Sequence, residues 1–126
     1  MDHKPRLIVA EDDLLIAWAV RVGLADQGYE VCGWADSGSE AVRLAELHRP
    51  DVAVVDSGLA NGTDGMAAAR EISSRLGIPV VMCSAHADAR THATGELRDE
   101  VPVVGWVSRP YRISDINRLI AAAVRH

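Results

Sequence analysis

Short runs of apolar, often β-branched residues alternate along this chain with longer segments of helical character. The five apolar runs are residues 7–10, 29–33, 52–55, 80–83 and 103–107. Strands that alternate with helices in this way are typical of βαβ units and a parallel sheet. The runs are almost continuously apolar, as expected of strands that helices cover on both faces. The pattern predicts a three-layer α/β fold with a doubly wound, five-stranded parallel sheet and five helices.

Capping signals mark the ends of the first two predicted helices. Gly28 closes the first helix, because glycine adopts the left-handed conformation that ends many helices. Ser37 and Glu40, three residues apart, form a capping box before the second helix at residues 41–49. Pro50 ends that helix, since proline cannot continue it.

The later helices are less uniform. A third helix is predicted at residues 65–76, and the last one is expected to begin at a Ser114 cap. The last helix carries its apolar residues on one face, namely Ile116, Leu119, Ile120 and Ala123. Residues 87–100 give the weakest helical pattern, because threonine and glycine lower helix propensity and few apolar residues recur there.

Length and charge narrow the class of protein. A chain of 126 residues with 48 % hydrophobic content predicts one domain with one core, residues 1–126, and no attached output domain. No apolar run reaches the roughly 18 residues of a membrane span. The net charge of −5 is spread along the chain, without the basic stripe that nucleic-acid binding needs. We therefore expect a cytoplasmic protein that binds neither membranes nor nucleic acid directly.

Polar residues follow four of the five predicted strands. They are Glu11, Asp12 and Asp13 after the first strand, Asp56 after the third, Ser84 after the fourth and Arg109 after the fifth. In an open parallel sheet, ligands bind outside the carboxyl ends of the strands, so we expect these side chains to meet. Gathered carboxylates repel each other unless a cation lies between them. The sequence therefore predicts a divalent metal site at this edge of the sheet.

Mg²⁺, or Mn²⁺ in its place, suits this set of donors. Magnesium prefers oxygen ligands and typically uses one or two carboxylates together with phosphate oxygens and waters. Asp12 and Asp56 are the expected ligands, and Glu11 reaches the ion through water. A carboxylate beside such an ion can attack phosphorus and form an aspartyl phosphate. Ser84 and Arg109, with the metal, would neutralise the charge on the transferring phosphoryl oxygens.

Five stretches of the sequence stand in a characteristic order and at a characteristic spacing, namely LIVAEDD, PDVAVVD, DGMAAAREI, IPVVMCSAH and GWVSRPY. With them the chain resembles the response-regulator receiver family of two-component signalling. The resemblance covers essentially the whole chain and implies a flavodoxin-like sheet of strand order 2-1-3-4-5. Residue by residue, it implies an acidic metal-binding pair at Glu11 and Asp12, the phosphoacceptor at Asp56, a metal-binding backbone carbonyl at Gly58, the switch hydroxyl at Ser84 and a small residue beside the phosphoryl group at Ala85.

The function that the resemblance implies is that of a stand-alone response regulator. It would accept a phosphoryl group on Asp56 from a histidine kinase or a histidine phosphotransfer protein, in a reaction that needs Mg²⁺. It would then signal through contact with an output protein that the sequence does not name. Such a domain is not an enzyme beyond its own phosphorylation and dephosphorylation.

Three positions depart from the usual pattern of that family. Arg109 stands where lysine is almost always found, and a guanidinium makes planar, bidentate contacts that an ammonium cannot. Trp106 stands where the switch aromatic is usually tyrosine or phenylalanine. The loop after Asp56 lacks the familiar proline, and we expect Asn-Gly at residues 61–62 to make its turn. The resemblance also favours a cis bond between Arg109 and Pro110. We expect the surface with Trp106 and Tyr111 to change on phosphorylation.

Two features stay open between a functional and a structural interpretation. His86 could touch the phosphoryl group or the attacking water, or it could be a solvated loop histidine. Residues 14–25 are apolar nearly all round, which exceeds what one sheet-facing stripe requires. This helix is either deeply buried or presents an end near Leu14, Leu15 and Trp18 that contacts the phosphodonor.

Other classes of function fit the sequence less well. A degenerate receiver that binds partners without phosphate would not need the intact acids and hydroxyl. A flavodoxin-like enzyme or flavin carrier would need a loop rich in glycine and hydroxyl groups where residues 11–14 read Glu-Asp-Asp-Leu. A phosphatase with an aspartate nucleophile would need a second aspartate where Gly58 stands.

Overall fold

One parallel sheet forms the centre of the molecule. The computed structural model describes residues 4–59, 65–84, 103–108 and 110–124. Its strands are β1 (Arg6–Ala10), β2 (Glu30–Ala35), β3 (Val52–Asp56), β4 (Val80–Ser84) and β5 (Gly105–Ser108). All pairs are parallel, in the order β2-β1-β3-β4-β5. The predicted fold class and strand order are confirmed.

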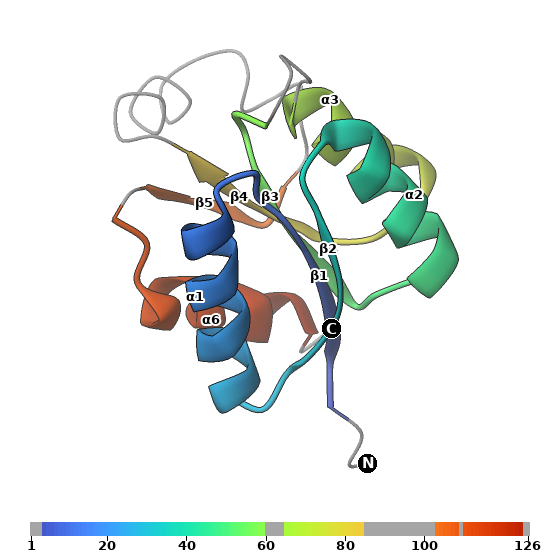
Figure 1. The fold of residues 1–126 in the computed structure, drawn as a ribbon. Coiled ribbons are helices and arrows are strands. Elements are labelled where there is room, and N and C mark those ends of the chain that lie inside the picture. The colour runs from blue at the N-terminus through green and yellow to red at the C-terminus, as the bar shows by residue number, and fades with distance from the viewer. Residues whose placement is uncertain (1–3, 60–64, 85–102, 109, 125–126) are drawn as a thin grey trace.

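Helices cover both faces of the sheet, as Figure 1 shows. The helices α1 (Leu14–Asp26) and α6 (Ile113–Val124) lie on one face. The other face carries α2 (Gly38–His48) and α3 (Gly65–Arg70), which continues as the π-helical turn η2 (Glu71–Arg75). The fourth predicted helix, at residues 87–100, lies outside the described residues. Among the described residues, no helix is long and apolar enough to span a membrane.

Each face of the sheet has its own apolar cluster. Buried side chains of β1, β3 and β4 point alternately to the two sides, as the pleat requires. The α2/α3 cluster includes Ile8, Val55, Met82 and Ile72, whereas the α1/α6 cluster includes Leu7, Val9, Leu24 and Ile120. Tyr29 joins the second cluster, and its hydroxyl donates a hydrogen bond to Asn117 Oδ1 on α6.

The predicted ends of the first two helices are confirmed. Gly28 has a φ of +97°, and its N–H donates to the Ala25 carbonyl while the N–H of Tyr29 donates to that of Leu24. These two bonds are those of a Schellman motif. Ser37 Oγ accepts a hydrogen bond of 3.3 Å from the Glu40 N–H, and α2 ends before Pro50.

Two boundaries differ from the prediction. The prediction that Ser114 caps the last helix was wrong, because α6 begins at Ile113 and the Arg112 carbonyl accepts from the N–H groups of Asp115 and Ile116. The fifth strand begins at Gly105, two residues later than predicted. A β-carbon on Gly105 would lie 2.8 Å from Leu119 Cδ2, so glycine lets α6 approach the edge strand closely.

Candidate functional site

Three acidic side chains converge at the carboxyl ends of β1 and β3. The potential ligand oxygens of Glu11, Asp12 and Asp56 all lie within 4.8 Å of one another. Glu11 and Asp56 are each only 3 % exposed, whereas Asp12 is exposed. Buried carboxylates at this spacing repel each other, and a hard cation with oxygen ligands would relieve that repulsion. The donor set therefore fits Mg²⁺ or Mn²⁺.

Asp56 is the last residue of β3 and is held by the sheet and by the loop that follows. It pairs in register with Cys83 of β4, and the Ser57 N–H donates a hydrogen bond of 2.8 Å to the Cys83 carbonyl. The Gly58 N–H donates to Asp56 Oδ1 at 3.3 Å. This turn orients the carboxylate, while the metal contact of the Gly58 carbonyl stays a prediction.

Glu11 is fixed at its backbone and at its side chain. Its N–H donates a hydrogen bond of 2.9 Å to the Ala35 carbonyl of β2. Its carbonyl accepts one of 2.8 Å from Trp34 Nε1, and its Oε2 accepts one of 3.0 Å from the Asp13 N–H. The sequence reasoning missed Trp34, which lies beyond the predicted end of the second strand.

Asp13 caps the helix that follows and is not one of the three converging acids. Its Oδ1 accepts hydrogen bonds of 3.0 and 3.1 Å from the N–H groups of Leu15 and Ile16, so Asp13 is the N-cap of α1. Of the three consecutive acids after β1, Glu11 and Asp12 therefore converge with Asp56, and Asp13 is the helix cap.

Ser84 presents a buried hydroxyl to the same end of the sheet. It ends β4, one residue beyond the partner of Asp56, and it is fully buried. Its Oγ makes no hydrogen bond to any residue in the described part of the chain. An unsatisfied buried hydroxyl costs about 1–3 kcal/mol. A phosphoryl oxygen on Asp56 would give this hydroxyl an acceptor, so the residue fits its predicted role.

Gly65 was not predicted as a site residue, although it belongs to the DGMAAAREI stretch. A β-carbon at this first residue of α3 would lie 2.1 Å from the Asp56 carbonyl oxygen and 2.9 Å from Ser57 Cα. Only glycine allows this approach of helix to strand end. The signal in the sequence was a glycine at the start of a helix, where it lowers helix propensity.

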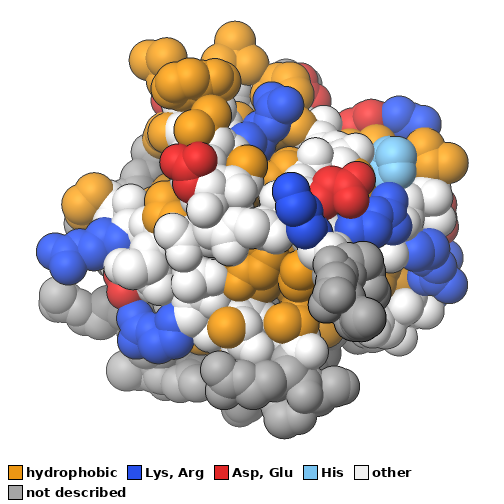
Figure 2. Space-filling model, turned by 90° about the horizontal axis from the view of Figure 1, so that it is seen from below, with side chains coloured by type: hydrophobic (Ala, Val, Ile, Leu, Met, Phe, Trp, Pro, Cys, Tyr) orange, Lys and Arg blue, Asp and Glu red, His pale blue; other side chains and the backbone are white. Residues whose placement is uncertain are grey.

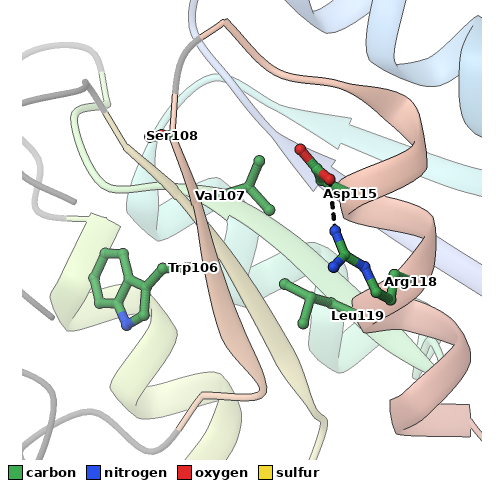
Figure 3. Close-up of a pocket in the computed structure, with 6 residues that line it drawn as sticks. All are labelled: Trp106, Val107, Ser108, Asp115, Arg118 and Leu119. Atoms are coloured by element: carbon green, nitrogen blue, oxygen red, sulfur yellow. Dashed lines mark hydrogen bonds and ion pairs between the residues drawn. The ribbon is translucent and has the colours of Figure 1, made fainter. Parts of the chain in front are cut away.

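Trp106 lies on β5 and packs, half-buried, against the α2/α3 cluster. Figure 3 shows its indole on the opposite side of the strand from Val107. A groove of about 300 Å³ runs between β5 and α6, lined by Trp106, Val107, Ser108, Asp115, Arg118 and Leu119. Arg118 and Asp115 form an ion pair of 2.6 Å in it. The groove contains none of the three converging acids, so it is a separate feature.

Several predicted features fall outside the described residues. They are Arg109 with its bond to Pro110, Ala85, His86 and the turn at residues 61–62. The roles predicted for them stay predictions. Tyr111 is described and packs, half-buried, against the α1/α6 cluster.

The outer face of α1 is apolar and exposed, which excludes deep burial of this helix. Leu14 is 68 % exposed, Leu15 79 %, Trp18 63 % and Val22 42 %. In Figure 2 a group of hydrophobic side chains gathers along the upper edge, on the side where α1 lies. We call these four residues the α1 patch. It begins directly after the Asp13 cap, beside the acidic loop.

Comparisons with known proteins agree with this geometry. A family model described as the response regulator receiver domain matches residues 7–121. The chain is 36 % identical over 119 residues to the transcriptional regulatory protein PdtaR of Mycobacterium tuberculosis, covering 94 % of this chain and 56 % of that protein. It is 27 % identical over 124 residues to the phyllosphere-induced regulator PhyR of Methylorubrum extorquens, covering 98 % of this chain and 45 % of that one.

A solved structure supports the same relationship. The signal receiver domain of a modulated diguanylate cyclase from Desulfovibrio desulfuricans superposes with a TM-score of 0.85 and 30 % identity, over 97 % of this chain and 94 % of that one. The chain spans about half the length of the curated relatives it matches.

Proposed function

Because the chain belongs to the response regulator receiver family, we propose that it accepts a phosphoryl group on Asp56 and passes the signal on by protein contact in the cytoplasm. The phosphodonor is a histidine kinase or a histidine phosphotransfer protein. The observation that carries the proposal is the convergence of buried Glu11 and Asp56 with exposed Asp12, within 4.8 Å, at the sheet end where the buried Ser84 hydroxyl lies.

Asp56 supplies the nucleophile of the transfer. One of its carboxylate oxygens attacks phosphorus in line, the nitrogen–phosphorus bond of the donor histidine breaks, and the imidazole keeps the electron pair. Phosphoryl transfer asks the protein chiefly for positioning and for neutralisation of charge. When bound, Mg²⁺ would be held by Asp12, Asp56 and, through water, Glu11, and would offset the negative charge of the phosphoryl oxygens.

Ser84 and Arg109 complete the binding of the phosphoryl group. The Ser84 hydroxyl donates to one phosphoryl oxygen and Arg109 pairs with the others, because a guanidinium offers two parallel donors. Movement of Ser84 toward the phosphoryl group vacates space into which Trp106 turns. The surface with Trp106 and Tyr111 thereby changes and provides the contact for the output protein.

We assign the α1 patch to the phosphodonor. The donor histidine must reach Asp56, and the patch continues directly from the acidic loop that borders the site. Exposed apolar side chains that gather on one surface often mark a site of protein contact. Contact there would align the donor with the carboxylate.

A flavin carrier on the same architecture is disfavoured by the start of α1. Such a carrier would bind its phosphate at the free N–H groups of this helix. The N–H groups of Leu15 and Ile16 already donate to the Asp13 carboxylate. A phosphate would have to displace a negatively charged cap beside Glu11 and Asp12.

The intact mass after incubation with acetyl phosphate and Mg²⁺ tests the proposal. The parent protein should gain the mass of one phosphoryl group, and only when the metal is present. Asp56→Asn should gain none, because an amide is not a nucleophile toward phosphorus. Equal, metal-dependent gain of phosphate by Asp56→Asn would refute the assignment of the phosphoacceptor.

A further inference from the structure

The indole of Trp34 bonds the peptide that joins the two site acids of the β1–α1 loop. Trp34 Nε1 donates a hydrogen bond of 2.8 Å to the carbonyl oxygen of Glu11. That oxygen belongs to the planar peptide unit between Glu11 and Asp12. The orientation of this peptide unit sets the direction in which the chain enters Asp12. The hydrogen bond from the indole restrains that orientation.

The same loop is held by a neighbouring residue of β2. The Glu11 N–H donates a hydrogen bond of 2.9 Å to the carbonyl of Ala35. Trp34 and Ala35, consecutive residues of β2, therefore bind both polar groups of the Glu11 backbone. Asp12 is exposed, whereas Glu11 is 3 % exposed and packed in place. The position of the Asp12 carboxylate thus depends on the backbone that Trp34 restrains.

A bulge in β2 aims the indole at this loop. Leu7 pairs with Val31 and Ile8 with Gly33, so Cys32 is an extra residue in the register between β1 and β2. Beyond the bulge, Trp34 pairs with Val9 and shares the α1/α6 face with it.

Without the bulge, the register of the pairs Arg6–Glu30 and Leu7–Val31 would continue unshifted along both strands. Gly33 would then oppose Val9, and Trp34 would turn to the α2/α3 face, away from α1. Bulges re-aim side chains in this way and are common beside active sites.

We infer that Trp34 is a positioning residue for the metal site, acting through the Glu11–Asp12 peptide. The inference rests on the proposed function, since it assumes that these acids bind Mg²⁺. Loss of the indole donor removes this restraint on the Glu11 carbonyl and frees the peptide to rotate. One hydrogen bond of this kind corresponds to about a three- to tenfold change in an equilibrium constant. Mg²⁺ affinity should fall by that factor in Trp34→Phe, which keeps an aromatic ring but has no donor.

Calorimetric Mg²⁺ titrations of the parent, Trp34→Phe and Leu47→Ala, well below their unfolding temperatures, test the inference. Leu47 is 64 % exposed on α2, so Leu47→Ala is the control and should bind Mg²⁺ like the parent. The indole N–H resonances of the ¹⁵N-labelled parent give a second readout. The protein has three tryptophans, and the loss of one signal in Trp34→Phe identifies that of Trp34. The Trp34 signal should shift with the midpoint of Mg²⁺ binding.

The outcomes separate the role of Trp34 from the function of the site. A purely structural tryptophan would lower the stability of Trp34→Phe and leave the Mg²⁺ affinity of its folded form unchanged, which would overturn the inference. If Trp34→Phe does not fold, Trp18→Phe and Trp106→Phe identify the other two indole signals. A remaining signal that stays constant through Mg²⁺ saturation of the parent would then overturn the inference. Absence of Mg²⁺ binding by the parent would contradict the proposed function itself.

Discussion

Gly65 and Asp56 are in backbone contact, with the first residue of α3 set against the last residue of β3. A β-carbon on Gly65 would lie 2.1 Å from the Asp56 carbonyl oxygen, a distance that no carbon–oxygen contact allows. The helix therefore rests directly on the strand end that carries the proposed phosphoacceptor. Any side chain at residue 65 must push the two apart.

Gly65→Ala should consequently damage both stability and phosphorylation. Forcing a methyl group into packed backbone costs about 1–3 kcal/mol, and the displacement falls on Asp56 itself. Urea unfolding measures the first effect, and the rate of mass gain with acetyl phosphate measures the second. Gly58→Ala is the control for stability, because a β-carbon there meets nothing within 4 Å. Equal unfolding free energies of the two alanine variants would contradict this account of Gly65.

Leu15→Ala should slow phosphotransfer from the cognate donor while leaving phosphorylation by acetyl phosphate unchanged. Leu15 is 79 % exposed in the α1 patch, so its truncation removes contact with a partner and little packing within the fold. Interface residues of this kind cost roughly 1–2 kcal/mol on truncation, a fall of about five- to thirtyfold in affinity. Leu47→Ala, which changes a 64 % exposed leucine on α2, should leave both reactions as in the parent. Unchanged transfer to Leu15→Ala would argue against docking at the α1 patch.

The sheet and the acids were predictable because each depends on local sequence. Five apolar runs fixed the strands, and Glu11, Asp12 and Asp56 stand directly after two of them. Because all strands of a parallel sheet run in one direction, residues that directly follow the strands lie at the same edge of the sheet, however the connecting helices pack. That geometry needed no knowledge of side-chain contacts.

The role of Trp34 and the start of α6 depend on contacts that the pattern does not contain. Trp34 reaches Glu11 only because the register shifts at Cys32, and a one-residue bulge leaves no mark in hydrophobic alternation. Ser114 is a good cap by residue type, yet the Arg112 carbonyl already accepts the first hydrogen bonds of α6. The contact of Trp34 with Glu11 thus depends on strand register, and the start of α6 depends on backbone hydrogen bonding.

Tyr29 should make stability fall at alkaline pH. Burial raises the pKa of the Tyr29 phenol above its usual value of 10.0. Above pH 10, the unfolded chain therefore loses this proton before the folded protein does, and the unfolded state gains stability. The contribution of Tyr29 is complete below about pH 10 and is lost as the pH rises through its folded-state pKa.

Urea unfolding at a series of pH values from 8 upward would measure this effect. Tyr29→Phe has no phenol to ionise, so its unfolding free energy should fall less steeply with pH than that of the parent. It should also be lower near neutral pH, because the hydrogen bond to Asn117 Oδ1 is lost. Parallel pH profiles of the two proteins would show that Tyr29 does not titrate differently on unfolding.

Ser84→Ala should stabilise the unphosphorylated protein and weaken its response to phosphate. The Ser84 hydroxyl is fully buried and lacks a hydrogen-bond partner among the described residues, so its removal relieves a desolvation cost. A gain of about 1 kcal/mol in the free energy of unfolding is expected. The phosphorylated form should gain no such benefit, because there the hydroxyl donates to a phosphoryl oxygen.

The control variant is Ser108→Ala. Ser108 is the exposed register partner of Ser84 on β5, and its substitution should change neither stability nor phosphorylation. Urea unfolding without phosphodonor gives the first quantity, and the extent of mass gain with acetyl phosphate and Mg²⁺ gives the second. A destabilised Ser84→Ala that is phosphorylated as fully as the parent would mean that the hydroxyl serves packing alone.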